Sequence, residues 1–316
     1  MNLTVASSPH IRGNFRTSRL MLDVVLALLP ALVVGAFVLG FRALLVALIS
    51  VAAAVTTELC YSWVLKKRNT VIDCSAIVTG LLFAMTLPVS VPYWIAVGGS
   101  AFAILVAKLM FGGLGQNIFN PALLARAAVM VLFPASLTRY PALGVDAVTS
   151  ATPLHHMVMP ALPEESILDM FLGNCPGSIG EISALALILG GVYLVVRKVI
   201  SIRTPLAYIG TVAVLTLVFH KTDDALSWML YSLFSGGLML GAIFMATDYV
   251  SSTATKGGHV IYGIGCGILT VLFRYYGLFP EGVTYAILLM NLCVWTIDRY
   301  TAPRVYGHKK GGAFRG

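Results

Sequence analysis

Apolar runs about as long as a bilayer is thick recur along the whole chain, and this feature most constrains the fold. The first run is Met21–Gly40, MLDVVLALLPALVVGAFVLG. A membrane-spanning helix needs about 20 such residues. Charged residues make up 11% of the 316 residues and hydrophobic residues 58%, whereas a soluble domain usually carries about 25% charged residues. The sequence therefore predicts an all-α polytopic membrane protein.

The apolar runs divide into two groups of five around one long polar interval. We expect a first five-helix repeat in residues 1–136, a loop over 137–181, and a second five-helix repeat with a C-terminal tail over 182–316. Because five is odd, the second repeat is inverted relative to the first, as in inverted-repeat transporters with broken helices. GLLFAMT (80–86) and GAIFMAT (241–247) form an internal echo five spans apart. We therefore expect ten transmembrane helices in two inverted repeats.

The net charge of +8 reports membrane topology. With a cytoplasmic N-terminus, 17 lysines and arginines fall on the cytoplasmic side, Lys108 and Arg126 among them. The four on the outer side are Arg42, Arg139, Lys221 and Arg274. Because basic residues favour the cytoplasmic side, we expect both termini in the cytoplasm and the 137–181 loop outside. Basic residues placed at helix ends argue against nucleic acid as a partner.

Metal ligands are not indicated by the sequence. None of the five cysteines forms a CxxC pair, and four of them lie in or beside apolar runs, where cysteine behaves as a small hydrophobe. His155 and His156 are adjacent, so they do not form the i, i+4 pair that binds a metal on one helix face. We expect no metal site.

The segment FGGLGQNIFNPALLARA (111–127) interrupts an apolar run with glycines, Asn117, Asn120 and Pro121. Broken backbone at membrane depth is tolerated only inside protein or beside a cavity. Asn120 before Pro121 is typical of a helix N-cap followed by proline at the first helical position. Two interpretations remain: a capped turn between two spans, or a ligand site near the cytoplasmic face, where free N–H groups attract an electron-rich ligand.

Acidic side chains in or near the spans give a second group of candidates. Asp248 ends an apolar run beside several hydroxyl residues and is either an interfacial acid in water or a hydrogen-bond acceptor or ion ligand in a cavity. Carboxylates in a membrane need a partner. We expect Glu58 to pair with Lys66 and Asp73 with Arg68 at the interface, and a role in an ion path stays open.

The loop segment GVDAVTSATPLHHM (144–157) contains Thr152 between small residues. A threonine hydroxyl is a poor nucleophile without an activating base, and the sequence places no histidine or lysine for that task. We therefore expect no catalytic residue here. Composition alone favours a linker, and the alternative is an exposed threonine that another enzyme modifies.

DAVTSATPL (146–154) resembles the flavinylation sequence of a family that contains the B subunit of the sodium-pumping quinone reductase and the D subunit of Rnf complexes. That pattern is D-x-x-S/T-x-A-T, with FMN joined through its phosphate to the last threonine. FGGLGQNIFNPALLARA, FMATDYVSS and EGVTYAILLMNLCVWTIDRYTAPRVYG also resemble family signatures, in the same order. The resemblance implies covalent FMN on Thr152, with Asp146 and Ser150 in the motif. Ser150 departs from the glycine of many relatives.

The resemblance further implies a non-covalent riboflavin in the membrane part, at Thr79, Asn117, Asn120 and Asp248. The length of the chain favours the Rnf branch, an ion-translocating ferredoxin:NAD oxidoreductase of the bacterial inner membrane. Its implied partners are the A, B, C, E and G subunits, chiefly G and C, and a flavin transferase. Electrons would pass from the outer FMN to riboflavin and drive Na⁺ or H⁺ translocation, with Asp248 or Glu58 as compensating groups.

Other functions stay open at this point, because a fold does not fix a function. A flavin-free channel or transporter of inverted-repeat fold predicts no bound chromophore. A quinone-reducing subunit predicts oxidation of the flavin by quinone. A third alternative is a scaffold that serves only assembly.

Overall fold

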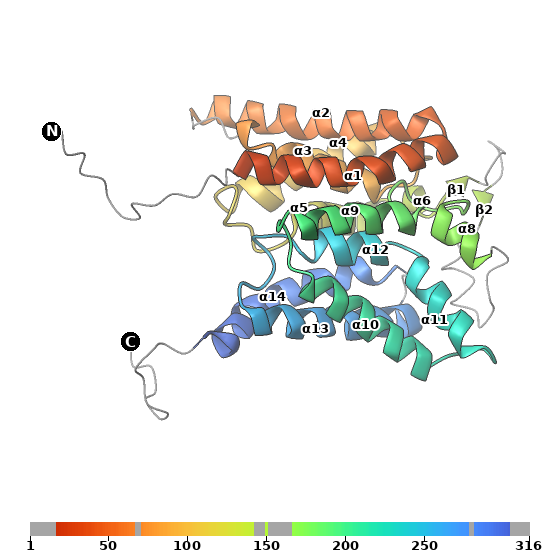
Figure 1. The fold of residues 1–316 in the computed structure, drawn as a ribbon. Coiled ribbons are helices and arrows are strands. Elements are labelled where there is room, and N and C mark those ends of the chain that lie inside the picture. Colours follow the sequence, from red (N-terminus) through yellow and green to blue (C-terminus); the bar gives the residue numbers. More distant parts are fainter. Residues whose placement is uncertain (1–16, 67–70, 142–148, 151–165, 278–280, 304–316) are drawn as a thin grey trace, which may run out of the picture.

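The computed structural model describes residues 17–66, 71–141, 149–150, 166–277 and 281–303 (Figure 1). The first group of helices is α1 (Thr17–Leu39), α2 (Phe41–Val64), the 3-10 helix η1 (Val71–Asp73), α3 (Ser75–Met85), α4 (Tyr93–Phe102), the π-helix η2 (Ala103–Leu109), α5 (Pro121–Leu132) and α6 (Pro134–Leu137). The later helices are α8 (Ile167–Leu172), α9 (Ala184–Val196), α10 (Arg203–Val218), α11 (Ala225–Phe234), α12 (Leu238–Leu240), the π-helix η3 (Gly241–Met245), α13 (Lys256–Tyr276) and α14 (Val283–Thr301). Two-residue strands, β1 (Tyr140–Pro141) and β2 (Thr149–Ser150), pair antiparallel.

The prediction of a helical membrane protein agrees with the lengths and composition of these helices. In the described part of the chain, α1, α2 and α13 are each long and apolar enough to cross a membrane. Helix α11 and the α12–η3 segment meet this test only together, and they are bent by 63° at a short break. The broken helix is therefore present, whereas the number of spans stays a prediction, because the remaining apolar helices are shorter.

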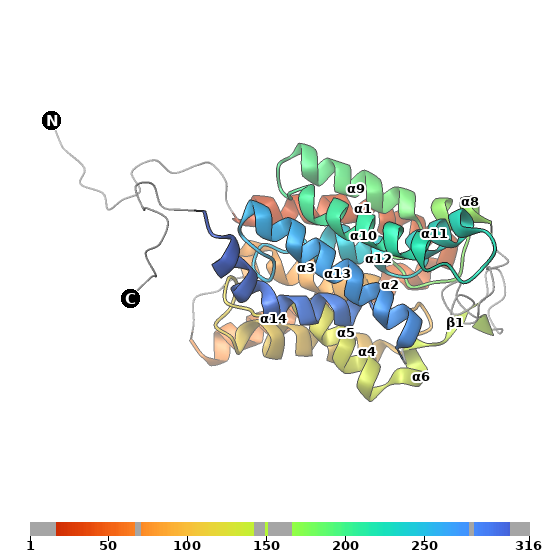
Figure 2. The same cartoon turned by 90° about the horizontal axis from the view of Figure 1, so that it is seen from below.

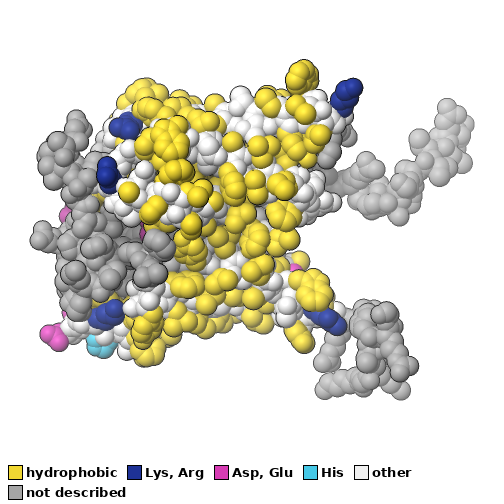
Figure 3. All heavy atoms as spheres, turned by 180° about the vertical axis from the view of Figure 1, so that it is seen from behind, with side chains coloured by type: hydrophobic (Ala, Val, Ile, Leu, Met, Phe, Trp, Pro, Cys, Tyr) yellow, Lys and Arg dark blue, Asp and Glu magenta, His cyan; other side chains and the backbone are white. Residues whose placement is uncertain are grey.

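The surface of the helical bundle is apolar in the way a lipid-facing surface is. Large side chains stand exposed along the helices: Phe37 is 86% exposed, Trp63 83% and Trp295 71%. Figure 3 shows hydrophobic side chains across the body of the molecule and Lys and Arg near its two ends. A soluble monomer rarely exposes so wide an apolar patch, so this surface fits a bilayer.

The helices form two sets that pack against each other (Figures 1 and 2). Helices α1 to α4 lie in one set and α10, α11, α13 and α14 in the other. The sets meet where α1 packs on α9 and α5 packs on α14. The start of α1 and the end of α14 lie at one end of the bundle, and β1, β2, α6 and α8 lie at the opposite end.

Small residues allow the closest contacts between helices. A Cβ atom on Gly263 of α13 would meet the Thr204 carbonyl oxygen of α10 at 2.8 Å, and one on Gly190 of α9 would collide with the Ala27 carbonyl of α1. In membranes, where lipid is as apolar as the helix surface, such small residues are the usual means of close packing. A larger side chain at either glycine would push the helices apart.

Arg274 stabilises the break between α11 and α12. Its guanidinium donates from Nη1 to the Ser232 carbonyl at 2.5 Å and from Nη2 to the Ser235 carbonyl at 3.0 Å. The last carbonyls of a helix have no partner within the helix, and lipid offers none. The sequence placed Arg274 outside by charge counting alone; the structure gives its buried side chain a role in closing this helix end.

Candidate functional site

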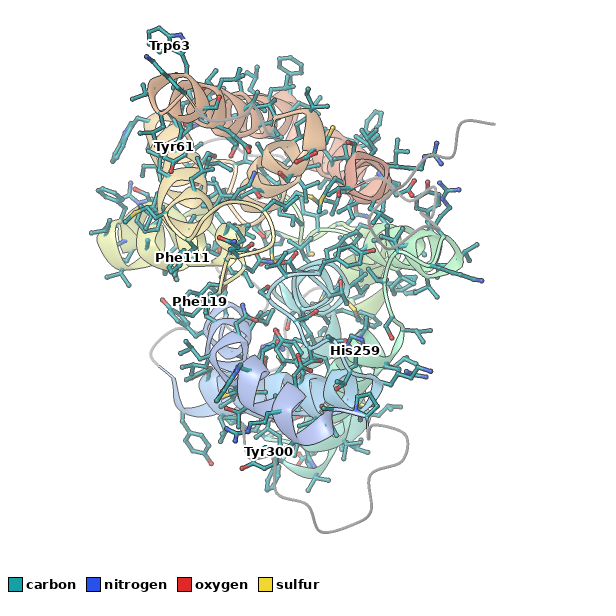
Figure 4. All side chains as sticks on the ribbon, turned by 90° about the vertical axis from the view of Figure 1, so that its left-hand side faces the viewer. Tyr61, Trp63, Phe111, Phe119, His259 and Tyr300 are labelled. Carbon is teal, nitrogen blue, oxygen red and sulfur yellow. The ribbon has the colours of Figure 1, made fainter. Side chains whose placement is uncertain are left out.

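A polar recess lies between the two sets of helices, at the end of the bundle where α1 begins. We use the term recess for the cavity of about 50 Å³ lined by Met21, Ser75, Val78, Thr79, Leu82, Lys108, Leu114, Asn117, Asn120, Pro121, Asp248 and Val250. Figure 4 looks onto this end, where Phe111 and Phe119 mark the loop between η2 and α5. The lining comes from both halves of the chain.

Asn120 fixes one wall of the recess. Its Oδ1 accepts hydrogen bonds from the backbone N–H groups of Ala122 and Leu123 at 3.1 and 3.4 Å, and Pro121 occupies the first turn of α5. The predicted N-cap is therefore confirmed. The Nδ2 of Asn120 donates to the Met245 carbonyl at 3.2 Å, which ties the start of α5 to the end of η3 in the other half.

The loop before Asn120 needs its glycines. Gly112, Gly113 and Gly115 have φ values of 115°, 100° and 96°, a region that side chains with a Cβ rarely adopt. The buried Asn117 donates from Nδ2 to the Phe119 carbonyl at 3.0 Å. The loop therefore folds back over itself and brings the Asn117 amide to the recess.

Thr79 and Asp248 complete the polar lining. The Thr79 hydroxyl donates to the Ser75 carbonyl within α3 at 3.0 Å, so its oxygen lone pairs remain available as acceptors. Asp248 follows η3 and accepts from the Ser251 hydroxyl at 2.8 Å. All four membrane residues that the sequence proposed for a flavin, Thr79, Asn117, Asn120 and Asp248, thus line one recess.

The chemistry of these residues fits the polar rim of an isoalloxazine ring, and the enclosed volume does not yet fit the ring itself. Amide, hydroxyl and carboxylate groups supply both donors and acceptors. A cavity of about 50 Å³ holds a few water molecules, each of which occupies about 30 Å³ in the liquid. A bound ring therefore requires the wall to move outward, and the glycine-rich loop that carries Leu114 is the part of the wall built from turns.

Glu58 and Lys108 form a buried ion pair, which differs from the pairing that the sequence predicted. Lys108 Nζ lies 2.9 Å from both carboxylate oxygens of Glu58 and donates to Ser75 Oγ at 2.7 Å. Glu58 is 0% and Lys108 2% exposed, so the expected pairing of Glu58 with Lys66 at the interface is wrong. Two opposite charges within apolar helices need one another, which was the signal available in the sequence. Asp73 lies in η1, and its expected partner Arg68 lies outside the described residues.

A second buried charge cluster corrects the placement of Arg126. This Arg126 cluster consists of Arg126, Glu181, Glu281 and Tyr140. The guanidinium pairs with Glu281, lies 3.9 Å from Glu181 and donates to the Thr86 carbonyl. Both acids were expected on the side opposite to Arg126. The cause of the error is that Arg126 lies inside α5 and not in a loop, so charge counting does not apply to it.

The Arg126 cluster connects to the segment that precedes Thr152. Tyr140 donates its hydroxyl hydrogen to Glu281 at 2.9 Å, and its backbone pairs with Ser150 in the β1–β2 ladder. Burial, with the nearby Glu181 carboxylate, raises the pKa of Tyr140 above its usual range, so the hydroxyl stays protonated and able to donate. Asp146 and Thr152 lie outside the described residues, and β2 lies at the end opposite to the recess.

These observations define a helical membrane protein with a polar ligand recess between two sets of helices. The chain belongs to the NQR2, RnfD, RnfE family, whose sequence model matches residues 4–307.

Three relatives, each the D subunit of its complex, show how far the similarity extends. The chain is 48% identical to that of the Na(+)-translocating ferredoxin:NAD(+) oxidoreductase complex of Acetobacterium woodii, over 98% of this chain and 97% of the relative. It is 43% identical to that of the proton-translocating ferredoxin:NAD(+) oxidoreductase complex of Clostridium ljungdahlii, over 97% of each. It is 38% identical to that of the ion-translocating oxidoreductase complex of Stutzerimonas stutzeri, over 93% of each.

Proposed function

We propose that this chain is the D-type membrane subunit of an Rnf complex, an ion-translocating ferredoxin:NAD oxidoreductase, and that it carries two flavins. Membership of the family and 48% identity to a relative of this type over nearly the full length support the assignment. The observation that carries the flavin part is the recess, where Thr79, Asn117, Asn120 and Asp248 come together from two halves of the chain. The chain then acts as part of an enzyme complex and holds no catalytic residue of its own.

The proposed flavin sites lie at opposite ends of the bundle. Thr152 would hold FMN as a phosphoester made by a flavin transferase, and β2, two residues before it, lies at the end remote from the recess. The recess would hold riboflavin, with Asn117 and Asn120 offering amide donors and Asp248 an acceptor. When bound, the flavins would supply carriers of one or two electrons. The protein's part is to keep the two sites apart and to orient each.

We also propose that the chain comprises two inverted repeats of five spans, in residues 1–136 and 182–316. The echo segments 80–86 and 241–247 support this, because each completes a short helix, α3 or α12–η3. Thr86 at the end of the first contributes its carbonyl to the Arg126 cluster, and Asp248 follows the second into the recess. Equivalent segments thus line cavities at opposite ends of the molecule.

The basic residues at these short helices follow the same pattern. Lys108, near the end of η2, donates to Ser75 at the start of α3. Arg274, near the end of α13, donates to Ser235 just before α12. A basic side chain from the fourth expected span of each half therefore contacts the start of the third, which is the relation that an internal repeat predicts.

In this proposal the bilayer is the bacterial cell membrane, with both termini cytoplasmic and Thr152 outside. The partners are the A, B, C, E and G subunits; G would deliver electrons to the FMN, and C lies toward NAD. The relatives include one named as Na(+)-translocating and one named as proton-translocating, so either ion suits the proposal. Asp248 is the candidate that compensates charge, whereas Glu58 already has Lys108 as its partner.

The test of the flavoprotein assignment is in-gel flavin fluorescence of the denatured full chain, co-expressed with a flavin transferase. We expect fluorescence in the wild type and none in Thr152→Ala. Thr138→Ala, an exposed threonine before the loop, is the matched control and should keep the signal. A wild type without fluorescence would return Thr152 to the role of a linker and favour a flavin-free channel or transporter. Oxidation of the flavin by quinone would favour the quinone-reducing relative.

A further inference from the structure

Lys108 is the one basic side chain among the residues that line the recess. Its ammonium is held between two partners: the Glu58 carboxylate on the side away from the recess and the Ser75 hydroxyl, which lines it. All three side chains are buried. Glu58 itself is not part of the lining, so the pair is ordered with its positive member toward the cavity.

This order has an electrostatic consequence. A buried ion pair is weak as a source of stability, because desolvation of both charges offsets their attraction. A fully buried pair next to a polar cavity therefore calls for another explanation. The Ser75 oxygen accepts from Lys108, so its own hydrogen points elsewhere and can be donated to a ligand. Such a donor is strengthened by the adjacent charge.

We propose that Lys108, acting through Ser75, is a positioning residue that makes the recess bind the reduced flavin ring more tightly than the oxidised ring. This inference rests on the proposal that the recess takes riboflavin. The neutral oxidised ring becomes an anion when it takes up two electrons and one proton, and positive potential favours that anion. Lys108 therefore raises the reduction potential of the bound flavin, and Glu58 limits the increase.

A series of variants should shift the midpoint potential of the flavin in opposite directions. Glu58→Gln leaves the ammonium without its counter-charge and should raise the midpoint potential above that of the parent. The double variant Glu58→Gln/Lys108→Met removes both charges and should lower it below the parent. Lys108→Arg keeps the charge and should stay near the parent. A purely structural pair predicts losses of stability but no such order.

The experiment is a spectroelectrochemical titration of the full chain purified with Thr152→Ala, so that only non-covalent flavin contributes. For the double variant we expect the affinity for the reduced ring, relative to the oxidised ring, to fall at least tenfold. For a two-electron couple that is a decrease of about 30 mV. Lys221→Met, an exposed lysine distant from the recess, is the control and should not change the potential.

Three outcomes would overturn the inference. Equal potentials in the parent and the double variant would remove the role of Lys108 and leave riboflavin in place. If the double variant loses its flavin, Ser75→Ala decides, because it keeps the ion pair: we expect a smaller decrease, and no decrease would overturn the inference. A parent without releasable flavin would overturn both the riboflavin proposal and this inference, and it is recognised before any potential is measured.

Discussion

The recess and the Arg126 cluster are built from corresponding parts of the two halves, yet they differ in what fills them. In the recess, Lys108 is held back by Glu58 and leaves about 50 Å³ among amide and hydroxyl groups. In the Arg126 cluster, the guanidinium occupies the centre between two carboxylates and leaves about 10 Å³. A buried charge can therefore either border a binding cavity or close one. We regard the first region as a ligand site and the second as structural.

The largest expected effect comes from removing Arg126. Arg126→Met would leave Glu181 and Glu281 as buried carboxylates without their common partner, and breaking a buried pair costs about 3–5 kcal/mol. We expect a marked decrease in the free energy of unfolding, measured by thermal unfolding in detergent, with riboflavin content unchanged at temperatures where the variant is folded. Arg139→Met, an exposed arginine nearby, serves as the control. A folded Arg126→Met variant that lost only its flavin would break the comparison.

A smaller effect is expected at Tyr140. Tyr140→Phe removes one hydrogen bond to the Glu281 carboxylate, and a hydrogen bond to a charged group contributes about 1.5–3 kcal/mol. Because Tyr140 also pairs with Ser150, we further expect slower modification of Thr152, measured as the rate at which covalent fluorescence appears with purified transferase. An unchanged rate together with lower stability would confine Tyr140 to the structural cluster.

The smallest effect on stability is expected in the recess. Asn120→Ala removes the N-cap of α5, which costs about 1 kcal/mol, and the bond to the Met245 carbonyl. Asn120→Asp keeps the cap and loses the amide donor, so it should be nearly as stable as the wild type. We expect both variants to lose non-covalent flavin, measured after acid release. If Asn120→Asp retained its flavin, the amide would serve packing and not ligand binding.

Local features of this molecule could be predicted from the sequence, whereas long-range partners could not. The helical character follows from runs such as Met21–Gly40, and the cap at Asn120 follows from two adjacent residues. The set of Thr79, Asn117, Asn120 and Asp248 came from resemblance, and no local pattern joins α3 to the segment after η3.

The two misplaced charges have a common cause. Glu58 and Lys108 are 50 residues apart, and Arg126 and Glu281 are 155 apart. Their pairing depends on how the helices pack. Counting charges by loop assumes that each basic residue faces water, and both Lys108 and Arg126 are buried.

The most direct test is the flavin stoichiometry of the purified full chain, with covalent and acid-released flavin measured separately. We predict one of each in the wild type, loss of only the covalent flavin in Thr152→Ala, and loss of only the released flavin in Asp248→Asn, with Arg126→Met retaining both while folded. A wild type with no released flavin, or a released flavin that depends on Arg126 and not on Asp248, would contradict the assignment of the recess as the ligand site.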